Sequence, residues 1–332
     1  MNDVVFWQWA IFGCLVAVLL ALDLLVFHRD DRAPSLRGSA CWTLFWCGLA
    51  LTFNGLLWWW RSQQAGPAEG REAALSFFIG YLVEWSLSMD NVFVFAVIFR
   101  FFQVPAQYQY RVLFWGILGA IGLRLLFILA GVQLINHFSW TVPLLGVLLV
   151  YTAVKLAIHT ETEVQPENNL VLRVARRWLR VSHGGHHEHG HAFFVRQAGH
   201  LCITPLFLVL LVIETTDIVF AVDSVPAILG ITKDPFVVFT SNIFAILGLR
   251  ALYFLLAGAI EAFRYLHYGL ATVLAFVGVS MIGDHFLVSE PGGHLVPTWA
   301  KLIVIATALG VAIAASLASN RAARSGNTSA KP

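Results

Sequence analysis

The feature that most constrains this chain is a series of apolar segments along its whole length. Each segment, folded as a helix, would be about as long as a lipid bilayer is thick. An α-helix needs about 20 mostly apolar residues to cross the hydrocarbon core of a membrane. We expect about nine such helices, with edges uncertain by a few residues, at 5–27, 40–60, 73–98, 112–134, 139–158, 201–226, 236–257, 266–287 and 298–319. The sequence therefore predicts an all-α polytopic membrane protein.

The composition supports a chain that is embedded in lipid along its length rather than held by one anchor. Only 12% of its residues are charged, against about 25% in soluble domains. The formal net charge of +2 offers no basic face, which argues against nucleic acid as a partner. The first residues lack the basic region of a cleavable signal, so the first apolar segment is expected to remain a transmembrane helix. We expect a multi-pass protein of a bacterial inner (plasma) membrane, and a homo-oligomer is compatible with the sequence.

Lys and Arg predict the orientation in the membrane. If the loop 28–39 is cytoplasmic, that side receives fifteen Lys and Arg and the other side four. Basic residues concentrate on the cytoplasmic side of membrane proteins. The N-terminus is therefore expected outside and the C-terminus in the cytoplasm.

The one long loop, 159–200, is expected in the cytoplasm. Its basic stretch, VLRVARRWLR, predicts an amphipathic helix on anionic lipid headgroups. The five histidines that follow could bind metal loosely, but a solvated tract is at least as good an interpretation. These residues are His183, His186, His187, His189 and His191.

Two pairs of segments indicate an internal repeat. GLRLLFILAG (122–131) resembles GLRALYFLLAG (248–258), and EWSLSMDNV (84–92) resembles DIVFAVDSV (217–225). The third to fifth helices then correspond to the sixth to eighth. A displacement by three helices makes the copies cross the bilayer in opposite senses, as in the inverted repeats of secondary transporters.

This 3+3 inverted repeat predicts the domain organisation. Two N-terminal transmembrane helices precede the first three-helix repeat. A cytoplasmic His-rich loop separates it from the second, inverted repeat, and a final helix and cytoplasmic tail follow. The predicted boundaries are 1–72, 73–158, 159–200, 201–287 and 288–332.

Seven charged residues lie inside the predicted spans. Each costs about 2.5–3.5 kcal/mol on insertion scales, so we expect them to face one another or a wet cavity. Five carboxylates against two arginines leave a formal surplus of three negative charges, which suits a divalent cation. A structural salt-bridge network is the alternative, and charge pairing is the expected role of Arg124 and Arg250.

The candidate metal ligands are all oxygen donors. They are Glu84, Asp90, Asn91, Glu214, Asp217, Asp223 and Ser224. Such a set favours Mn²⁺, Mg²⁺ or Ca²⁺ over zinc or copper. Accessory positions are Asp23, Ser88, Asn242 and Asp284.

The roles of the accessory positions and the course of the acidic helices stay open. Asp23 and Asp284 are expected at the membrane interface. Asn242 is equally interpreted as a ligand or as an interhelical hydrogen-bond partner. A break in each helix that carries an acidic motif would turn its acids inwards. The alternative is an unbroken helix whose Asp90 faces a neighbouring span.

Four motifs resemble the TerC family, and within it the Alx-type members. They are LDLLVFHR (22–29), EWSLSMDNVFVF (84–95), ETTDIVFAVDSVPAILGIT (214–232) and FTSNIFAILGLRALYFLL (239–256). The resemblance covers nearly the whole chain. It implies an integral membrane protein of the wider LysE-like transporter group, in a family linked to tellurium resistance by name and to manganese export by function. The family's acidic motif residues fall on Glu84, Asp90, Asn91, Glu214, Asp217 and Asp223.

Together, these observations predict a divalent metal ion transporter that moves Mn²⁺ from the cytoplasm through a midplane acidic site. Ca²⁺ and Mg²⁺ stay alternatives, and no organic cofactor is expected. An enzyme is not expected, because no H-E-x-x-H or G-x-S-x-G motif lies in a span. The rival hypothesis is a non-transporting membrane partner in a tellurite or stress response, or in metal delivery to exported enzymes.

Overall fold

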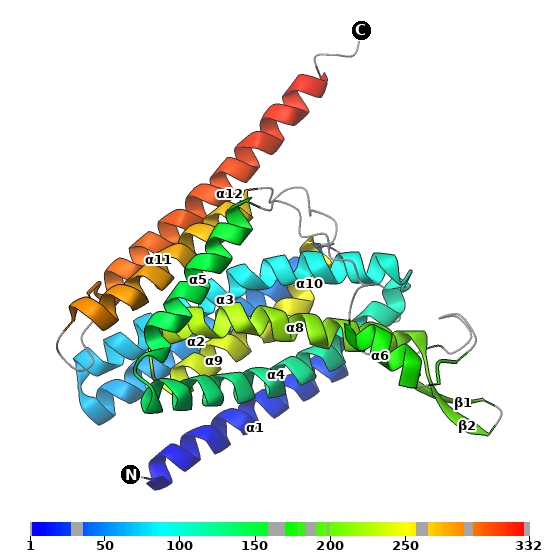
Figure 1. Cartoon of the computed structure of the whole chain (residues 1–332), viewed down its shortest axis with the longest axis horizontal. Coiled ribbons are helices and arrows are strands. Elements are labelled where there is room, and N and C mark those ends of the chain that lie inside the picture. Colours follow the sequence, from blue (N-terminus) through cyan, green and yellow to red (C-terminus); the bar gives the residue numbers. More distant parts are fainter. Residues whose placement is uncertain are drawn as a thin grey trace.

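The computed structural model describes residues 2–27, 36–158, 170–178, 180–182, 190, 192–197, 199–256, 265–288 and 295–328. Within these residues, nine helical segments are long and apolar enough to cross a membrane. The spans are α1 (Asn2–Phe27), α2 (Leu36–Ala65), α3 (Pro67–Phe101), α4 (Ala106–His137), α5 (Thr141–Ile158), α8 (Pro205–Leu229), α9 (Pro235–Leu247) with α10 (Leu249–Leu256), α11 (Leu266–Leu287) and α12 (Thr298–Thr328). The prediction of an all-α polytopic membrane protein is confirmed, and Figure 1 shows the bundle that these helices form.

The two helices that carry the acidic motifs are continuous. Helix α3 begins with Pro67 at its first turn and runs for 35 residues without interruption. Helix α8 begins after Thr204, whose side chain accepts a hydrogen bond from the Phe207 amide, and it continues past Pro226 to Leu229. The expected breaks are therefore absent from both described helices, and the alternative of unbroken helices is correct.

The interruption falls instead in the seventh span. Helix α9 starts at Pro235, and the Asp234 side chain caps it by accepting from the amides of Phe236 and Val237. It stops before Gly248, and α10 resumes at Leu249. The apolar window of this span is entirely buried within the protein. It packs against α2, α3 and α4, so it forms the centre of the bundle.

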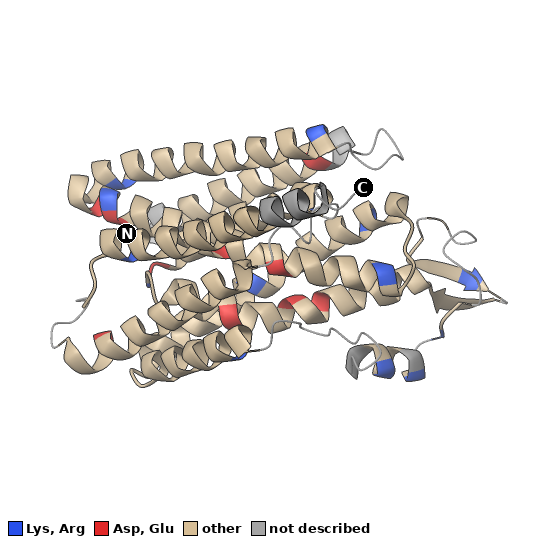
Figure 2. Ribbon diagram, turned by 90° about the horizontal axis from the view of Figure 1, so that it is seen from above, with Lys and Arg blue, Asp and Glu red and all other residues tan. Residues whose placement is uncertain are grey.

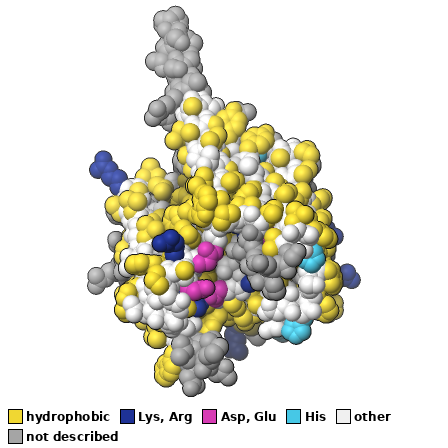
Figure 3. All heavy atoms as spheres, turned by 90° about the vertical axis from the view of Figure 1, so that its left-hand side faces the viewer, with side chains coloured by type: hydrophobic (Ala, Val, Ile, Leu, Met, Phe, Trp, Pro, Cys, Tyr) yellow, Lys and Arg dark blue, Asp and Glu magenta, His cyan; other side chains and the backbone are white. Residues whose placement is uncertain are grey.

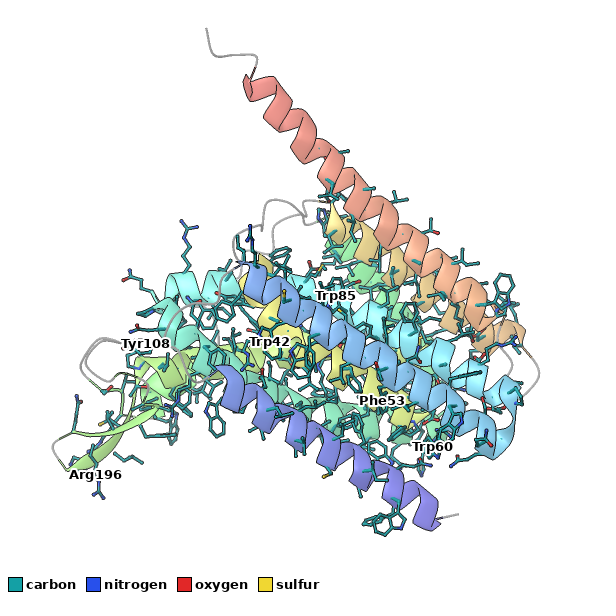
Figure 4. All side chains as sticks on the ribbon, turned by 180° about the vertical axis from the view of Figure 1, so that it is seen from behind. Trp42, Phe53, Trp60, Trp85, Tyr108 and Arg196 are labelled. Atoms are coloured by element: carbon teal, nitrogen blue, oxygen red, sulfur yellow. The ribbon has the colours of Figure 1, made fainter. Side chains whose placement is uncertain are left out.

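Helices α4 and α8 run side by side in the same direction. A Cβ on Gly116 would lie 3.3 Å from Ile213, and one on Gly131 would lie 2.9 Å from Leu229. Both helices therefore begin at one end of the bundle, beside a β-hairpin. We call this end the hairpin end, and the end where α8 stops the far end. Figure 4 shows Trp60 near the far end and Arg196 at the hairpin end.

Helices α5 and α11 cross at two glycines. A Cβ on Gly146 would lie 2.8 Å from the carbonyl oxygen of Gly278, and one on Gly278 would lie 2.6 Å from that of Gly146. Only glycine allows two backbones to approach this closely, as at small-residue crossings of other membrane helices. Figure 1 shows α5, α11 and α12 grouped together on one side of the bundle.

The long segment 159–200 contains a helix at its basic stretch, as predicted, and the first strand of a β-hairpin that was not predicted. It includes α6 (Leu170–Trp178) and β1 (Phe194–Gln197), which pairs antiparallel with β2 (His200–Ile203). The sixth span therefore begins at Pro205 rather than 201, because the apolar residues Leu201 to Ile203 belong to the strand. On α6, Leu172 and Ala175 are buried against the protein while Trp178 is exposed. The histidine cluster lies outside the described residues.

Candidate metal-ion site

A buried arginine of α4 lies where four helices meet. Its guanidinium contacts the Glu84 carboxylate of α3, and its Nη2 lies 3.3 Å from Oδ1 of Asp217 on α8. Nη1 also donates to Oδ1 of Asn242 on α9 at 2.8 Å and approaches Oγ of Ser224 at 3.4 Å. Arg124 itself is only 1% exposed. We call Arg124, Glu84, Asp217, Asn242 and Ser224 the central cluster.

The central cluster leaves several buried polar atoms without a hydrogen bond. In the part of the chain that the structure describes, Glu84 Oε2, Asp217 Oδ2 and Arg124 Nε have no partner. Unpartnered buried polar atoms are rare in folded proteins, and each calls for an explanation. Two carboxylates against one guanidinium also leave a formal surplus of one negative charge. The cluster therefore has both the free oxygens and the charge to receive a cation.

The acids of α3 and α8 outside the central cluster lie toward the two ends of the bundle. Asp90 follows Glu84 by six residues, or about 9 Å along a helix axis, toward the hairpin end. It is half-buried, whereas Asn91 and Ser88 are buried. Asp223 follows Asp217 by the same interval toward the far end. Since α3 and α8 run in opposite directions, the acidic side chains are spread in a row through the bundle.

Two members of this row have neighbours that the sequence did not identify. The Glu214 carboxylate lies directly against Gly119 of α4, where any Cβ would collide with it. Asp223 Oδ1 accepts a hydrogen bond from Thr152 of α5 at 2.9 Å. Glu214 thus lies between the hairpin end and Asp217, and Asp223 is held beside α5. The sequence signal for Gly119 is modest: it is a glycine about one and a half helical turns before Arg124.

The second predicted charge-pairing arginine lies elsewhere. Arg250 of α10 forms a buried ion pair with Asp23 of α1. Its guanidinium lies over the ring of Tyr110, 4.2 Å from the centroid. The interfacial position expected for Asp23 stays a prediction, and its carboxylate is buried against α10 and α4. Among the described residues, Arg124 pairs with the central acids Glu84 and Asp217, whereas Arg250 pairs with Asp23.

Asp284, expected at the membrane interface, is half-buried and has two neighbours among the described residues. Its Oδ1 accepts from the Leu295 amide at 2.6 Å, and its Oδ2 lies 3.8 Å from Nζ of Lys301. Lys301 is buried at the start of α12. Sequence reasoning counted it only as a charge on the outer side of the membrane. Its position inside an apolar segment was the signal that could have marked it as buried.

The predicted ligands do not converge on one point. Among the described residues, no three His, Cys, Asp or Glu side chains are grouped closely enough to hold a metal ion. The acids are spread in a row along α3 and α8, and at the centre the guanidinium of Arg124 contacts both Glu84 and Asp217. Figure 2 shows acidic and basic positions close together in the middle of a bundle that is otherwise largely free of charge. The arrangement is that of acids paired with an internal cation.

The cysteines contribute no comparable group. All four are free thiols, two of them exposed, one half-buried and one buried. The half-buried Cys47 accepts a hydrogen bond from the Tyr81 hydroxyl at 3.2 Å. Thus no disulfide links these four residues.

Known proteins resemble this chain along most of its length. The family model described as "Integral membrane protein TerC family" matches residues 69–324. An uncharacterized membrane protein of Myxococcus xanthus is 45% identical over 313 residues, which are 94% of this chain and 92% of that protein. A protein of Escherichia coli (strain K12) named "Putative membrane-bound redox modulator Alx" is 47% identical over 275 residues, which are 82% of this chain and 85% of that protein. No solved structure matches significantly.

Proposed function

Because the chain belongs to the TerC family of integral membrane proteins, we propose that it exports a divalent metal ion across the bacterial inner membrane, with Mn²⁺ as the first choice. One observation carries the proposal. Glu84 and Asp217 come from the two predicted repeats and share the guanidinium of Arg124, and each keeps a buried oxygen that has no partner among the described residues. A pair of carboxylates at the centre of the bundle suits a doubly charged ion.

Arg124 acts in this proposal as the resident cation of the empty state. When a divalent ion arrives, the two carboxylates turn from the guanidinium to the metal, and their formal charge of −2 is neutralised. When the ion leaves, Arg124 returns and prevents the acids from repelling one another. The oxygens of Ser224 and Asn242, which contact Arg124 in its resident position, then become available as further hard ligands.

The row of acids supports a route through the bundle. If the hairpin end faces the cytoplasm, as the distribution of Lys and Arg predicts, the ion first meets Asp90 and Glu214. It then binds between Glu84 and Asp217 and leaves past Asp223. Continuous helices make this a path along packed side chains rather than through unwound backbone.

Flux measurements in proteoliposomes test the proposal directly. We expect the purified full chain to carry Mn²⁺, and we expect Glu84→Gln and Asp217→Asn to abolish that flux. Glu69→Gln is the matched control, because Glu69 is an exposed carboxylate at the start of the same helix, α3. Comparison of Mn²⁺ with Ca²⁺, Mg²⁺ and Zn²⁺ gives the selectivity. Absence of flux for every metal with the wild-type protein would contradict transport.

The same experiment separates transport from its rival. A non-transporting partner that delivers metal to exported enzymes would bind Mn²⁺ through the central cluster but give no flux. In cells, Asp90→Asn and Asp223→Asn should each raise intracellular manganese during growth in excess manganese. Unchanged manganese in both variants would contradict export along the row of acids.

A further inference from the structure

Of the three transmembrane helices outside the predicted repeats, α1 and α12 each contribute a buried charge at one end of the bundle. Asp23 of α1 pairs with Arg250 of α10. Lys301 of α12 donates to the carbonyl oxygen of Gly230, where α8 ends, at 3.1 Å and lies near Asp284 of α11. A buried charge needs compensating partners, so each contact joins its helix firmly to the bundle.

The two contacts lie on opposite sides of the central cluster. Helices α4 and α8 run in the same direction, which places Tyr110, the neighbour of Arg250, at the hairpin end and Gly230 at the far end. From Tyr110 to Arg124 there are 14 residues, or about 21 Å of helix. From Asp217 to Gly230 there are 13 residues, or about 20 Å. Arg124 and Asp217 are therefore each about 20 Å of helix from one of the two contacts, and the row of acids lies between the contacts.

The contact at the hairpin end joins three helices. The guanidinium of Arg250 pairs with the Asp23 carboxylate and lies over the ring of Tyr110. The Tyr110 hydroxyl donates to the backbone carbonyl of Asp23 at 3.3 Å. All three residues thus hold α1, α4 and α10 together where an ion would enter. We call them the hairpin-end clamp.

The contact at the far end joins four helices. Lys301 is 1% exposed, and its ammonium lies at the carbonyl end of α8, where the helix dipole favours a positive charge. Its neighbour Thr298 donates to the Glu72 carboxylate of α3. With Asp284 of α11, these residues tie α12 to α3, α8 and α11. We call Lys301, Gly230, Asp284, Thr298 and Glu72 the far-end clamp. Figure 3 shows acidic and basic side chains gathered near the middle of this end, among hydrophobic ones.

We propose that these clamps are the two gates of the ion route and that α1 and α12 hold them shut. The inference rests on the proposed function. Both acidic helices reach the far-end clamp, since α3 supplies Glu72 and α8 supplies the Gly230 carbonyl. At the other end, the hairpin-end clamp holds Arg250 on the helix that continues from α9, which carries Asn242 of the central cluster. Both clamps are formed in this structure, and the central cluster between them is buried. Transport then requires one clamp to release while the other stays closed.

Labelling of one buried cysteine tests the two gates separately. Ser88→Cys is the probe, because Ser88 is buried on α3 one turn from Glu84 and its hydroxyl has no partner among the described residues. The four native cysteines are replaced by alanine. A membrane-impermeant maleimide is then added to one side of sealed vesicles at a time. A separate chain with Arg196→Cys, exposed on the hairpin, identifies the hairpin side.

The two clamp variants should open opposite sides. Lys301→Met keeps the length of the side chain but removes its charge, and it should raise labelling from the far side about tenfold or more. Asp23→Asn should raise labelling from the hairpin side by a similar factor. Arg61→Gln is the matched control, because the half-buried Arg61–Asp234 pair joins α2 to the start of α9 outside the far-end clamp. It should leave labelling unchanged.

Milder variants serve if the first ones do not fold. Thr298→Val removes the bond to Glu72, and Tyr110→Phe removes the bond to Asp23 while keeping the ring under Arg250. Thr298→Val should raise labelling from the far side, as Lys301→Met does, but less. Tyr110→Phe should raise labelling from the hairpin side, as Asp23→Asn does, but less. Labelling that is unchanged, or that rises from the same side in both cases, would overturn the proposal. The labelling experiment needs no metal, so its outcome is independent of the flux measurement. A wild-type protein without Mn²⁺ flux would refute the proposed function, whereas the labelling pattern tests the two gates.

Discussion

Glu84 and Asp217 occupy corresponding positions in the two predicted repeats, and both contact the guanidinium of Arg124. The sequence pairs them by motif, and the fold brings them together around one cation. The shared arginine makes each acid dependent on the other, because removing the guanidinium leaves two carboxylates facing each other in a buried space.

Arg124→Gln should lower the free energy of unfolding by about 3–5 kcal/mol, the cost of removing one partner from a buried ion pair. The double variant Glu84→Gln with Arg124→Gln should recover part of that loss, because it removes one of the two carboxylates that have lost the guanidinium. Denaturant unfolding in detergent of the wild type, both single variants and the double variant gives the coupling energy. A coupling energy near zero would show that the contact does not contribute to stability.

Mn²⁺ should stabilise Arg124→Gln more than it stabilises the wild type. In the wild type the metal must compete with the guanidinium, whereas in the variant both carboxylates are free. The melting temperature with and without Mn²⁺ measures this difference, since a ligand raises stability according to its affinity for the folded state. Asp217→Asn combined with Arg124→Gln is the control and should show little response. An equal rise in the wild type and in Arg124→Gln would mean that the metal binds elsewhere.

Gly119→Ala should reduce ion transport while changing stability little. The added methyl collides with the Glu214 carboxylate, which is the far end of a flexible side chain and can turn away at small cost. If Glu214 lies on the ion route, its displacement slows flux. Gly122→Ala is the matched control on the same helix, because nothing lies within 4 Å of its Cβ position. Equal flux in the two variants would exclude Glu214 from the route.

Gly146→Ala should destabilise the protein by about 1–3 kcal/mol, the usual cost of forcing extra volume into packed helices. Here the methyl meets the backbone carbonyl of Gly278, which cannot rotate away, so α5 and α11 must separate. Gly310→Ala in α12 is the control, because its Cβ position has no neighbour within 4 Å. Thermal unfolding in detergent compares them. A Gly146→Ala protein as stable as its control would show that the crossing tolerates separation.

The number of spans and the course of the acidic helices show what hydropathy can and cannot predict. Span length and apolar content are local properties, so the nine helices were predictable. The start of the sixth span was not, because the strand residues Leu201 to Ile203 are as apolar as the helix that follows. Pro226 suggested a break, but it lies in the last turn of α8, where only one backbone bond is lost before the helix ends. The actual interruption is at Gly248.

The sequence could predict least well which charged residues pair with one another in the folded protein. Depth along a helix places Glu84, Asp217 and Arg124 near one level, and their meeting follows from that. Depth does not determine which way a helix is rotated or which helix lies beside it. Arg250 is therefore found with Asp23 of α1 rather than with the central acids. The buried position of Lys301 depends in the same way on how α12 packs. The inverted repeat itself stays a prediction.

The enclosure of the seventh span bears on how the protein is assembled during synthesis. Among the described residues, the helices that pack most extensively against α9 are α2, α3 and α4, all of which precede it in the chain. The ribosome has therefore produced these three helices before α9 emerges, so the span can leave the translocation machinery beside its main packing partners. Helices α11 and α12 follow later in the chain.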